Sequence, residues 1–385
     1  MRLTHFWLLI LLASACKQHK TDSSPNPTTY SMDTVFIDAK GEILDVDYSL
    51  FYSAIVPDQP FLYNFNHFDN HLEKIHLDKR ELVSKVPFQK EGPNGTGTSL
   101  TSFQFFGHDR LLISDDLSKA KVFDLKGKVL KNINLRDHSW KGEVLSDTEK
   151  CRQKLFVDHG TIKLLTLVRE EGLKAANTAE LALFDLKNDS IVRFDIDPEG
   201  KIKKYSLISE DNSYLRPQIF LSIENNTPIL SHQFTNEIYW YDSISKKITE
   251  VDYSGQLTPN EVSTELGNMF ESTEQLFEVF EKMNEQIRFG PLVYDQKNEQ
   301  YYRFSFQSEF KSKSERESLT PEIKSVNAYL TIFDNEFNVI NESLIPEFNR
   351  PITHYFARDG KLWILNKEND EMAFVRIEFN YPSGS

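Results

Sequence analysis

One pattern in this sequence limits the possible folds more than any other: two short runs of β-forming residues joined by a tight turn, repeated six times. The runs are rich in β-branched and aromatic residues, which favour extended strands. The six turns begin near Pro57, Gly107, His159, Glu224, Asp295 and Arg358, about 60 residues apart. This spacing predicts one structural unit used six times.

A second pair of strands follows each of the first five hairpins. These pairs share an apolar run, an aspartate, a polar turn and an alternating run; the aspartates are Asp78, Asp124, Asp185, Asp242 and Asp334. Aspartate accepts hydrogen bonds from turn amides, so we expect a structural role for all five. Four strands in each of six repeats predict an all-β fold, a six-bladed β-propeller with four-stranded blades.

The two ends of the chain complete this prediction. The last repeat holds only three strands, in "THYFARDGKLWILN" and "EMAFVRIEFNY", whereas the N-terminal run "DTVFIDAKGEILDV" supplies a spare one. Pairing the spare strand with the last repeat would close the ring and remove an exposed strand edge. We therefore predict that the propeller covers residues 33–381.

The N-terminus indicates export. An arginine precedes an apolar run, and small residues lead from that run into Cys16. The run is shorter than the about 20 residues that cross a bilayer and is typical of a secretory signal. We interpret residues 1–15 as a lipoprotein signal peptide, Cys16 as the lipid-bearing residue that attaches to a membrane, and residues 16–32 as a flexible tether. Ordinary cleavage near Ala15, without lipid, is the alternative.

The glycine-rich stretch "KEGPNGTG", residues 90–97, lies between the first two repeats. It lacks the lysine and the following helix of a phosphate-binding loop, so we interpret it as a turn between sheets. Its Gly-Pro-Asn-Gly core, with the signal and the repeat pattern, resembles the six-bladed propeller lipoproteins of the Bacteroidota. The resemblance implies the same fold and a lipid-anchored place in the cell envelope, at the outer membrane, and it implies no activity.

Composition narrows the partners and the chemistry. A net charge of −14 argues against nucleic acid, whose phosphates favour a basic surface. With Cys16 lipidated, Cys151 stands alone, so we expect no intramolecular disulfide. The sequence has no nucleophile elbow, no zinc-protease motif and no histidine cluster with metal-ligand spacing. We therefore predict no metal and no cofactor.

An insertion between the fourth and fifth repeats has helical spacing. Apolar residues recur three or four apart across 259–287, after a capping-box start at Thr258, Pro259 and Glu261. We predict a helical segment over residues 259–287. It either packs over the edge of the propeller or docks a partner protein.

Four arginines occupy matching places in the last four repeats. Arg152, Arg216, Arg288 and Arg350 each lie just before the first strand of their repeat. The longer connections emerge at one end of such a fold, here called the long-loop face. First strands line a propeller's channel, so we expect these guanidiniums to gather at its mouth on that face. They would bind carboxylate, sulfate or phosphate; alternatively, each pairs with an acid on a neighbouring blade.

Further polar residues fall at the ends of second strands on the same face: His232, Arg303, His67 and Arg169. We expect a binding or interaction module for an anionic glycan or small molecule, with His232 and Arg303 assisting the four arginines. Two other interpretations stay open. One is a glycan hydrolase or lyase that uses loop acids or His232, and the other is a scaffold that docks an envelope protein through residues 259–287.

Overall fold

The computed structural model describes residues 29–380, apart from 47–49, 57–58, 108, 137–139, 158–161, 171–178, 198, 243–244, 252, 264, 266, 351, 353 and 369. The predicted signal peptide, Cys16 and the tether up to residue 28 lie outside the described residues, as does residue 381. The chain is mostly β. Its described strands form five four-stranded sheets, one five-stranded sheet and one three-stranded sheet.

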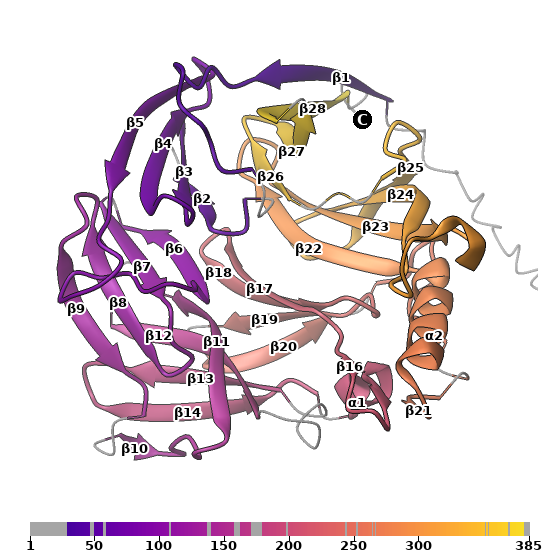
Figure 1. Cartoon of the computed structure of the whole chain (residues 1–385), viewed down its shortest axis with the longest axis horizontal. Helices are drawn as coiled ribbons and strands as arrows, with labels where there is room; N and C mark the ends of the chain where they lie inside the picture. The colour runs from indigo at the N-terminus through magenta and orange to yellow at the C-terminus, as the bar shows by residue number, and fades with distance from the viewer. Residues whose placement is uncertain are drawn as a thin grey trace, which may run out of the picture.

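The first three sheets follow one another along the chain (Figure 1). The first contains β2 (Ser53–Ile55), β3 (Phe61–Asn66), β4 (His71–His76) and β5 (Glu81–Pro87). The second contains β6 (Ser102–Phe106), β7 (Arg110–Ser114), β8 (Lys119–Asp124) and β9 (Val129–Asn134). The third contains β11 (Glu149–Phe156), β12 (Lys163–Glu170), β13 (Glu180–Asp185) and β14 (Ser190–Asp195), with the short β10 (Lys141–Gly142) parallel to β14.

The remaining large sheets repeat this order. The fourth contains β17 (Ile219–Glu224), β18 (Thr227–His232), β19 (Ile238–Asp242) and β20 (Lys247–Val251). The fifth contains β22 (Arg288–Asp295), β23 (Gln300–Phe310), β24 (Ile323–Phe333) and β25 (Val339–Leu344). The sixth contains β26 (Tyr355–Arg358), β27 (Lys361–Glu368), β28 (Glu371–Asn380) and β1 (Thr29–Phe36). All six predicted hairpins are confirmed as antiparallel pairs of a first and a second strand.

The repeated aspartates act as turn residues at three of the predicted positions. Asp124 Oδ1 accepts hydrogen bonds from the amides of Lys126 and Lys128, both at 2.9 Å. Asp185 and Asp334 bind the amides of their own turns in the same way. An aspartate that satisfies two turn amides fixes the loop and hence the register of the hairpin.

Six apolar clusters of described residues join the sheets, and each draws on two neighbouring sheets. Between the first and second sheets, Tyr63 stacks on Phe105 with ring centroids 4.7 Å apart. Between the sixth and first sheets, Phe356 and Trp363 pack in one cluster with Leu62. Apolar burial of this kind is the main favourable term in folding. In Figure 1, the strands β5, β9 and β14 lie at the rim of the molecule, while β2, β6 and β17 lie nearer its middle.

The N-terminal strand pairs with the C-terminal one. β1 runs antiparallel to β28, from Thr29 opposite Asn380 to Phe36 opposite Ala373. It therefore begins four residues before the boundary predicted at residue 33, and residues 29–32, predicted to be part of the tether, belong to this strand. Tyr30 and Met32 alternate inward and pack against the cluster between the fifth and sixth sheets, which is why the strand extends this far.

The predicted helical segment is helical only in its second half. Helix α2 spans Thr273–Gln286 and begins at Ser272, whose side chain accepts a hydrogen bond from the amide of Gln275. The expected helix start near Pro259 is wrong, because Glu342 of β25 accepts hydrogen bonds from the amides of Gln256 and Leu257 and from the Thr258 hydroxyl. These contacts hold that segment in a non-helical form.

Other elements surround the helix. A small sheet forms from β15 (Leu207–Ser209), β16 (Tyr214–Leu215) and β21 (Met269–Phe270), next to helix α1 (Lys201–Tyr205). The 90–97 stretch lies between β5 and β6, as predicted for a turn between sheets. Among the described residues, no helix combines the length and apolar character needed to cross a membrane.

Candidate functional site

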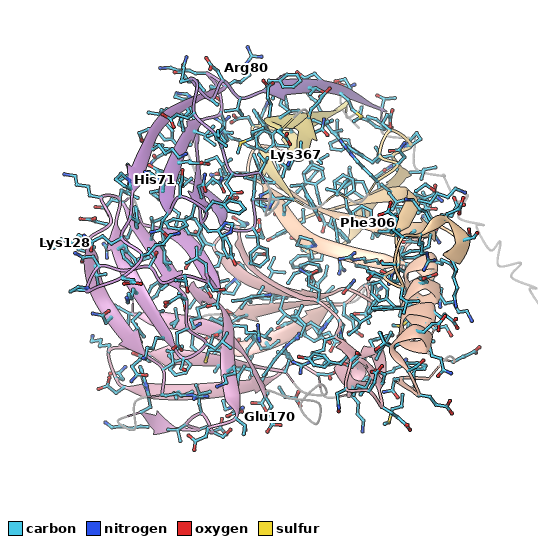
Figure 2. All side chains as sticks on the ribbon, viewed as in Figure 1. His71, Arg80, Lys128, Glu170, Phe306 and Lys367 are labelled. Atoms are coloured by element: carbon cyan, nitrogen blue, oxygen red, sulfur yellow. The ribbon has the colours of Figure 1, made fainter. Side chains whose placement is uncertain are left out.

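Three arginines meet where the third and fourth sheets face each other, and we call them the basic cluster: Arg152, Arg169 and Arg216. Arg152 on β11 lies opposite Leu167 on β12, and Arg169 is two residues further along β12. Residues that lie opposite each other or two apart point to the same side of a sheet. Arg169 Nη2 lies 3.5 Å from the carbonyl oxygen of Pro217, the residue after Arg216. Figure 2 labels Glu170, which follows Arg169 at the end of β12.

A β-bulge between Arg152 and Leu155 fixes the local backbone. Within it, Gln153 adopts a positive φ of 51° and turns its side chain toward the fourth sheet. Gln153 Nε2 donates to the carbonyl of Ile219 at 2.8 Å, and its Oε1 accepts from the amide of Leu221 at 3.0 Å. Bulges re-aim side chains beside functional sites. Here the bulge ties the two sheets together next to the cluster.

The three guanidiniums of the cluster lie close enough for their positive charges to affect one another. Burial, followed by the positive charges of Arg216 and Arg152, lowers the pKa of Arg169 to about 10. Arg169 remains protonated at neutral pH, and the buried Nε of its guanidinium has no hydrogen-bond partner among the residues that the structure describes. Within the described residues, neither Arg152 nor Arg169 forms an ion pair with a carboxylate. Like charges held close together in a protein of charge −14 would be stabilised by an anion.

The bulge also buries a lysine that the sequence reading did not identify. Lys154 is completely buried, and its Nζ donates to Ser114 Oγ and to the carbonyls of Asp116 and Cys151, at 2.9 to 3.1 Å. Burial lowers its pKa to about 8. Three acceptors satisfy the three protons of the ammonium group, so Lys154 has a structural role between the second and third sheets. The sequence gives no signal for it beyond a charged residue in a strand.

Two of the four predicted arginines lie elsewhere. Arg288 is the half-buried first residue of β22, and burial lowers its pKa with no contribution from a neighbouring charge. Arg350 is exposed and donates to Asn366 Oδ1 of β27. The structure therefore groups Arg152 and Arg216 with Arg169, while Arg350 lies apart from them and borders a cavity.

Arg303 and His232, both expected to assist ligand binding, are buried in the fold. Arg303 is completely buried and donates to the carbonyl of Gly290 through Nε. Its Nη atoms donate to carbonyls of the 232–236 segment, at 2.9 to 3.3 Å. The guanidinium lies against the ring of Phe289 at 4.8 Å. Since its donors are engaged by the main chain, Arg303 fastens the fourth sheet to the fifth, and this geometry does not support a ligand role.

His232 is likewise enclosed. Its ring meets Tyr239 edge-on with centroids 5.4 Å apart, and only 6 % of the residue is exposed. Burial, followed by the charges of Arg303 and Arg169, lowers its pKa to about 3. The neutral imidazole is out of reach of solvent, so it is not placed to act as a ligand or as the catalytic group of the enzyme alternative.

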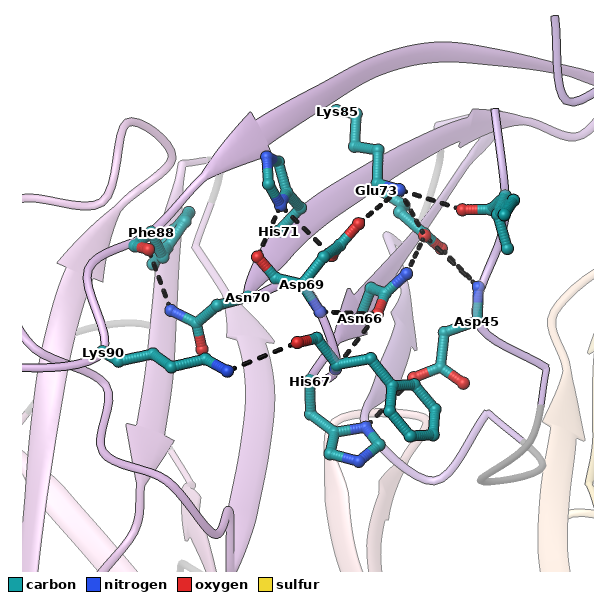
Figure 3. Close-up of polar contacts among 12 residues, drawn as sticks. Asp45, Asn66, His67, Asp69, Asn70, His71, Glu73, Lys85, Phe88 and Lys90 are labelled. Carbon is teal, nitrogen blue, oxygen red and sulfur yellow. Dashed lines mark hydrogen bonds and ion pairs between the residues drawn. The ribbon is translucent and has the colours of Figure 1, made fainter. Parts of the chain in front are cut away.

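A buried polar network supports the turn that carries His67 (Figure 3). His67 Nδ1 lies 3.1 Å from Asp45 Oδ2, whose side chain is almost fully buried. Beneath them, the fully buried Glu73 accepts hydrogen bonds from Asn64 at 2.8 Å and from Asn66 at 2.9 Å. Burial raises the pKa of Glu73. A network satisfied in this way is rigid, so it holds the 66–71 turn in place.

The same turn is fastened from outside. Lys85 Nζ lies 2.6 Å from Asp69 Oδ2 and donates to the carbonyl of Ile43 at 2.9 Å, and Lys90 donates to the carbonyl of Phe68 at 3.3 Å. The sequence reading singled out His67 and missed Glu73. The sequence signal for Glu73 is an acidic residue within the alternating apolar pattern of "HLEKIH". In the part of the chain that the structure describes, no group of three histidine, cysteine or acidic side chains could hold a metal ion.

Comparison of the sequence with models of protein families identifies the family of this chain. A family model described as "Domain of unknown function (DUF4221)" matches residues 26–344. The chain belongs to the DUF4221 family. No curated protein matches it.

Solved structures agree with this family. A DUF4221 member from Bacteroides vulgatus superimposes with a TM-score of 0.63 at 12 % identity, over 92 % of this chain and 98 % of that one. A candidate exported protein from Bacteroides fragilis gives a TM-score of 0.57 at 12 % identity, over 91 % and 96 %. At this identity the likeness concerns the fold, which this DUF4221 protein shares along almost its whole described length.

Proposed function

We propose that this DUF4221 protein is an envelope-attached binding module that holds an anionic group at the basic cluster. The observation that carries the proposal is the convergence of Arg152, Arg169 and Arg216 at the junction of two sheets, with no carboxylate on Arg152 or Arg169 among the described residues. Planar guanidiniums bind carboxylate, sulfate or phosphate through paired hydrogen bonds. The ligand class is an anionic glycan or an anionic small molecule.

The scaffold for this site, in our proposal, is a closed six-bladed propeller. The support is the six large sheets, the six apolar clusters between neighbouring sheets, and the pairing of β1 with β28. In such a ring, β11, β12 and β17 place the cluster where strands of two blades meet. A rigid scaffold pre-organises the arginines and so lowers the entropy lost on binding.

The proposed location is the cell envelope. The signal-like N-terminus and Cys16 support a lipid anchor, and the similar Bacteroides fragilis protein is a candidate exported protein. A lipid on Cys16 would leave the 16–28 segment between the membrane and β1. Stable anchoring by lipid takes more than one acyl chain or a second signal. Labelling the protein with radioactive palmitate in cells tests the anchor, and Cys16→Ser should abolish the label.

A thermal-shift titration of the full chain with sulfate, phosphate and galacturonate tests the binding site. A ligand that binds the folded state raises Tm by mass action. We expect at least one anion to raise Tm in the wild type and to have little effect in Arg169→Gln and Arg152→Gln. Arg110→Gln removes the same charge at the start of β7, beside Asp109, and should respond like the wild type. Equal responses in all four proteins would refute the site.

A further inference from the structure

A cavity lies apart from the basic cluster. It has a volume of about 600 Å³ and lies between β1, β27 and the segment that leads from the fifth sheet to the sixth. This volume is in the range of small-molecule sites, about 300 to 1,000 Å³. Figure 1 shows β1 running beside β28 and β27 at this edge of the molecule.

The floor of the cavity is apolar. Met32, Ile352 and Val375 line it, and all three are half-buried on the cluster between the fifth and sixth sheets. Phe348 and Ile364 lie beneath them and are buried. The floor thus offers an apolar surface to one face of a ligand.

The rim is polar and carries both signs of charge. Arg350 and Glu347 line it, and both are exposed. Other contacts hold them in place: Arg350 donates to Asn366, and Glu347 accepts from the Tyr30 hydroxyl at 2.8 Å. A carboxylate has about four lone-pair sites and a guanidinium five donors, so each group keeps capacity for a ligand.

This combination selects a ligand class. An anion would meet the carboxylate of Glu347, and an acyl chain would desolvate the polar rim without replacing its hydrogen bonds. A sugar ring has an apolar C–H face for the floor and hydroxyls that both donate and accept at the rim. We propose that this cavity binds a neutral saccharide of one or two rings, independently of the anion site.

Saturation-transfer NMR and calorimetry on the full chain with maltose, lactose and diacetylchitobiose test the proposal. We expect at least one of these probes to bind, and binding to weaken about tenfold in Arg350→Gln and in Asn366→Leu, the typical effect of losing a hydrogen bond to a charged or fixed partner. Both positions lie at the rim, and a thermal-unfolding scan checks that each variant is folded.

Three results would overturn the saccharide site: no binding of any probe, equal binding by the wild type and both folded rim variants, or stronger binding of glucuronate than of the neutral sugars. Arg152→Gln separates this site from the anion site. That variant should lose the response to anions and bind the saccharide as the wild type does, so the two proposals fail independently.

Discussion

The guanidinium of Arg303 on β23 donates a hydrogen bond of 2.9 Å to the main-chain carbonyl of His232 at the end of β18. The sequence analysis predicted that both residues bind a ligand, whereas in the structure the side chain of one contacts the main chain of the other. Their contact joins the fourth sheet to the fifth. Measurable consequences follow from this contact and from other buried or paired charges in the fold.

The first consequence concerns stability. Arg303→Met should lower the free energy of unfolding by about 3 kcal/mol or more, because it leaves the buried carbonyls of the 232–236 segment without donors. Urea denaturation measures the change. Arg110→Met, at a partly exposed position, should cost less than about 0.5 kcal/mol. Similar losses in the two variants would contradict the structural role of Arg303.

The second prediction concerns stability at acidic pH. Burial lowers the pKa of His232 to about 3 in the folded state, below the ordinary value of 6.5. Between these values the unfolded chain binds more protons, so the neutral histidine's contribution is present above pH 6.5 and is lost as the pH falls toward 3. His232→Gln should show a shallower loss of stability over this interval in urea melts. A slope equal to that of the wild type would count against the assignment.

The third prediction concerns stability at alkaline pH. Burial lowers the pKa of Lys154 to about 8, from 10.5. The unfolded chain then binds more protons between these two values, so Lys154 makes the wild type more stable as the pH rises through this interval. Lys154→Met cannot titrate. We expect the difference in unfolding free energy to shift in favour of the wild type from about pH 8 to about pH 10, measured by urea melts at each pH, and a constant difference would disprove it.

The fourth concerns the loop between β23 and β24, which is bound to helix α2. Arg316 is nearly buried and pairs with Glu281 at 2.8 Å, while the exposed Lys313 lies 2.6 Å from Glu278. Arg316→Gln should speed amide exchange across 311–322 several-fold while changing global stability little. Lys324→Gln removes an exposed pair with Glu309 and serves as the control. Unchanged exchange in Arg316→Gln would mean that the ion pair does not hold the loop.

Local pattern was enough to predict the strands, because hairpins and turn aspartates depend on neighbours in sequence. Asp124 illustrates this, since its partners are two and four residues away. The helix was half predicted. The spacing around Leu276 and Met283 gave α2, whereas the contacts of Glu342 with residues 256–258, far along the chain, prevent the earlier turn from forming.

The candidate site was harder to predict because contacts between sheets decide which charges are exposed. Arg152 and Arg303 look alike in sequence, yet one is exposed and the other has no contact with solvent. Lys154 and Glu73 are satisfied by partners that only the folded chain brings near. Local sequence alone therefore does not separate exposed charged side chains from buried ones.

The pairing of β1 with β28 also sets an order of events during synthesis. Asp33 contacts Arg376, 343 residues later, so the first strand of the described chain cannot pair with β28 until almost all of the chain has been made. Contacts this distant in sequence form slowly, because a long loop must close before they contribute. Until the ten residues of β28 leave the ribosome, the strand edge that they cover stays unpaired, and a chain that ends early keeps that edge exposed to aggregation.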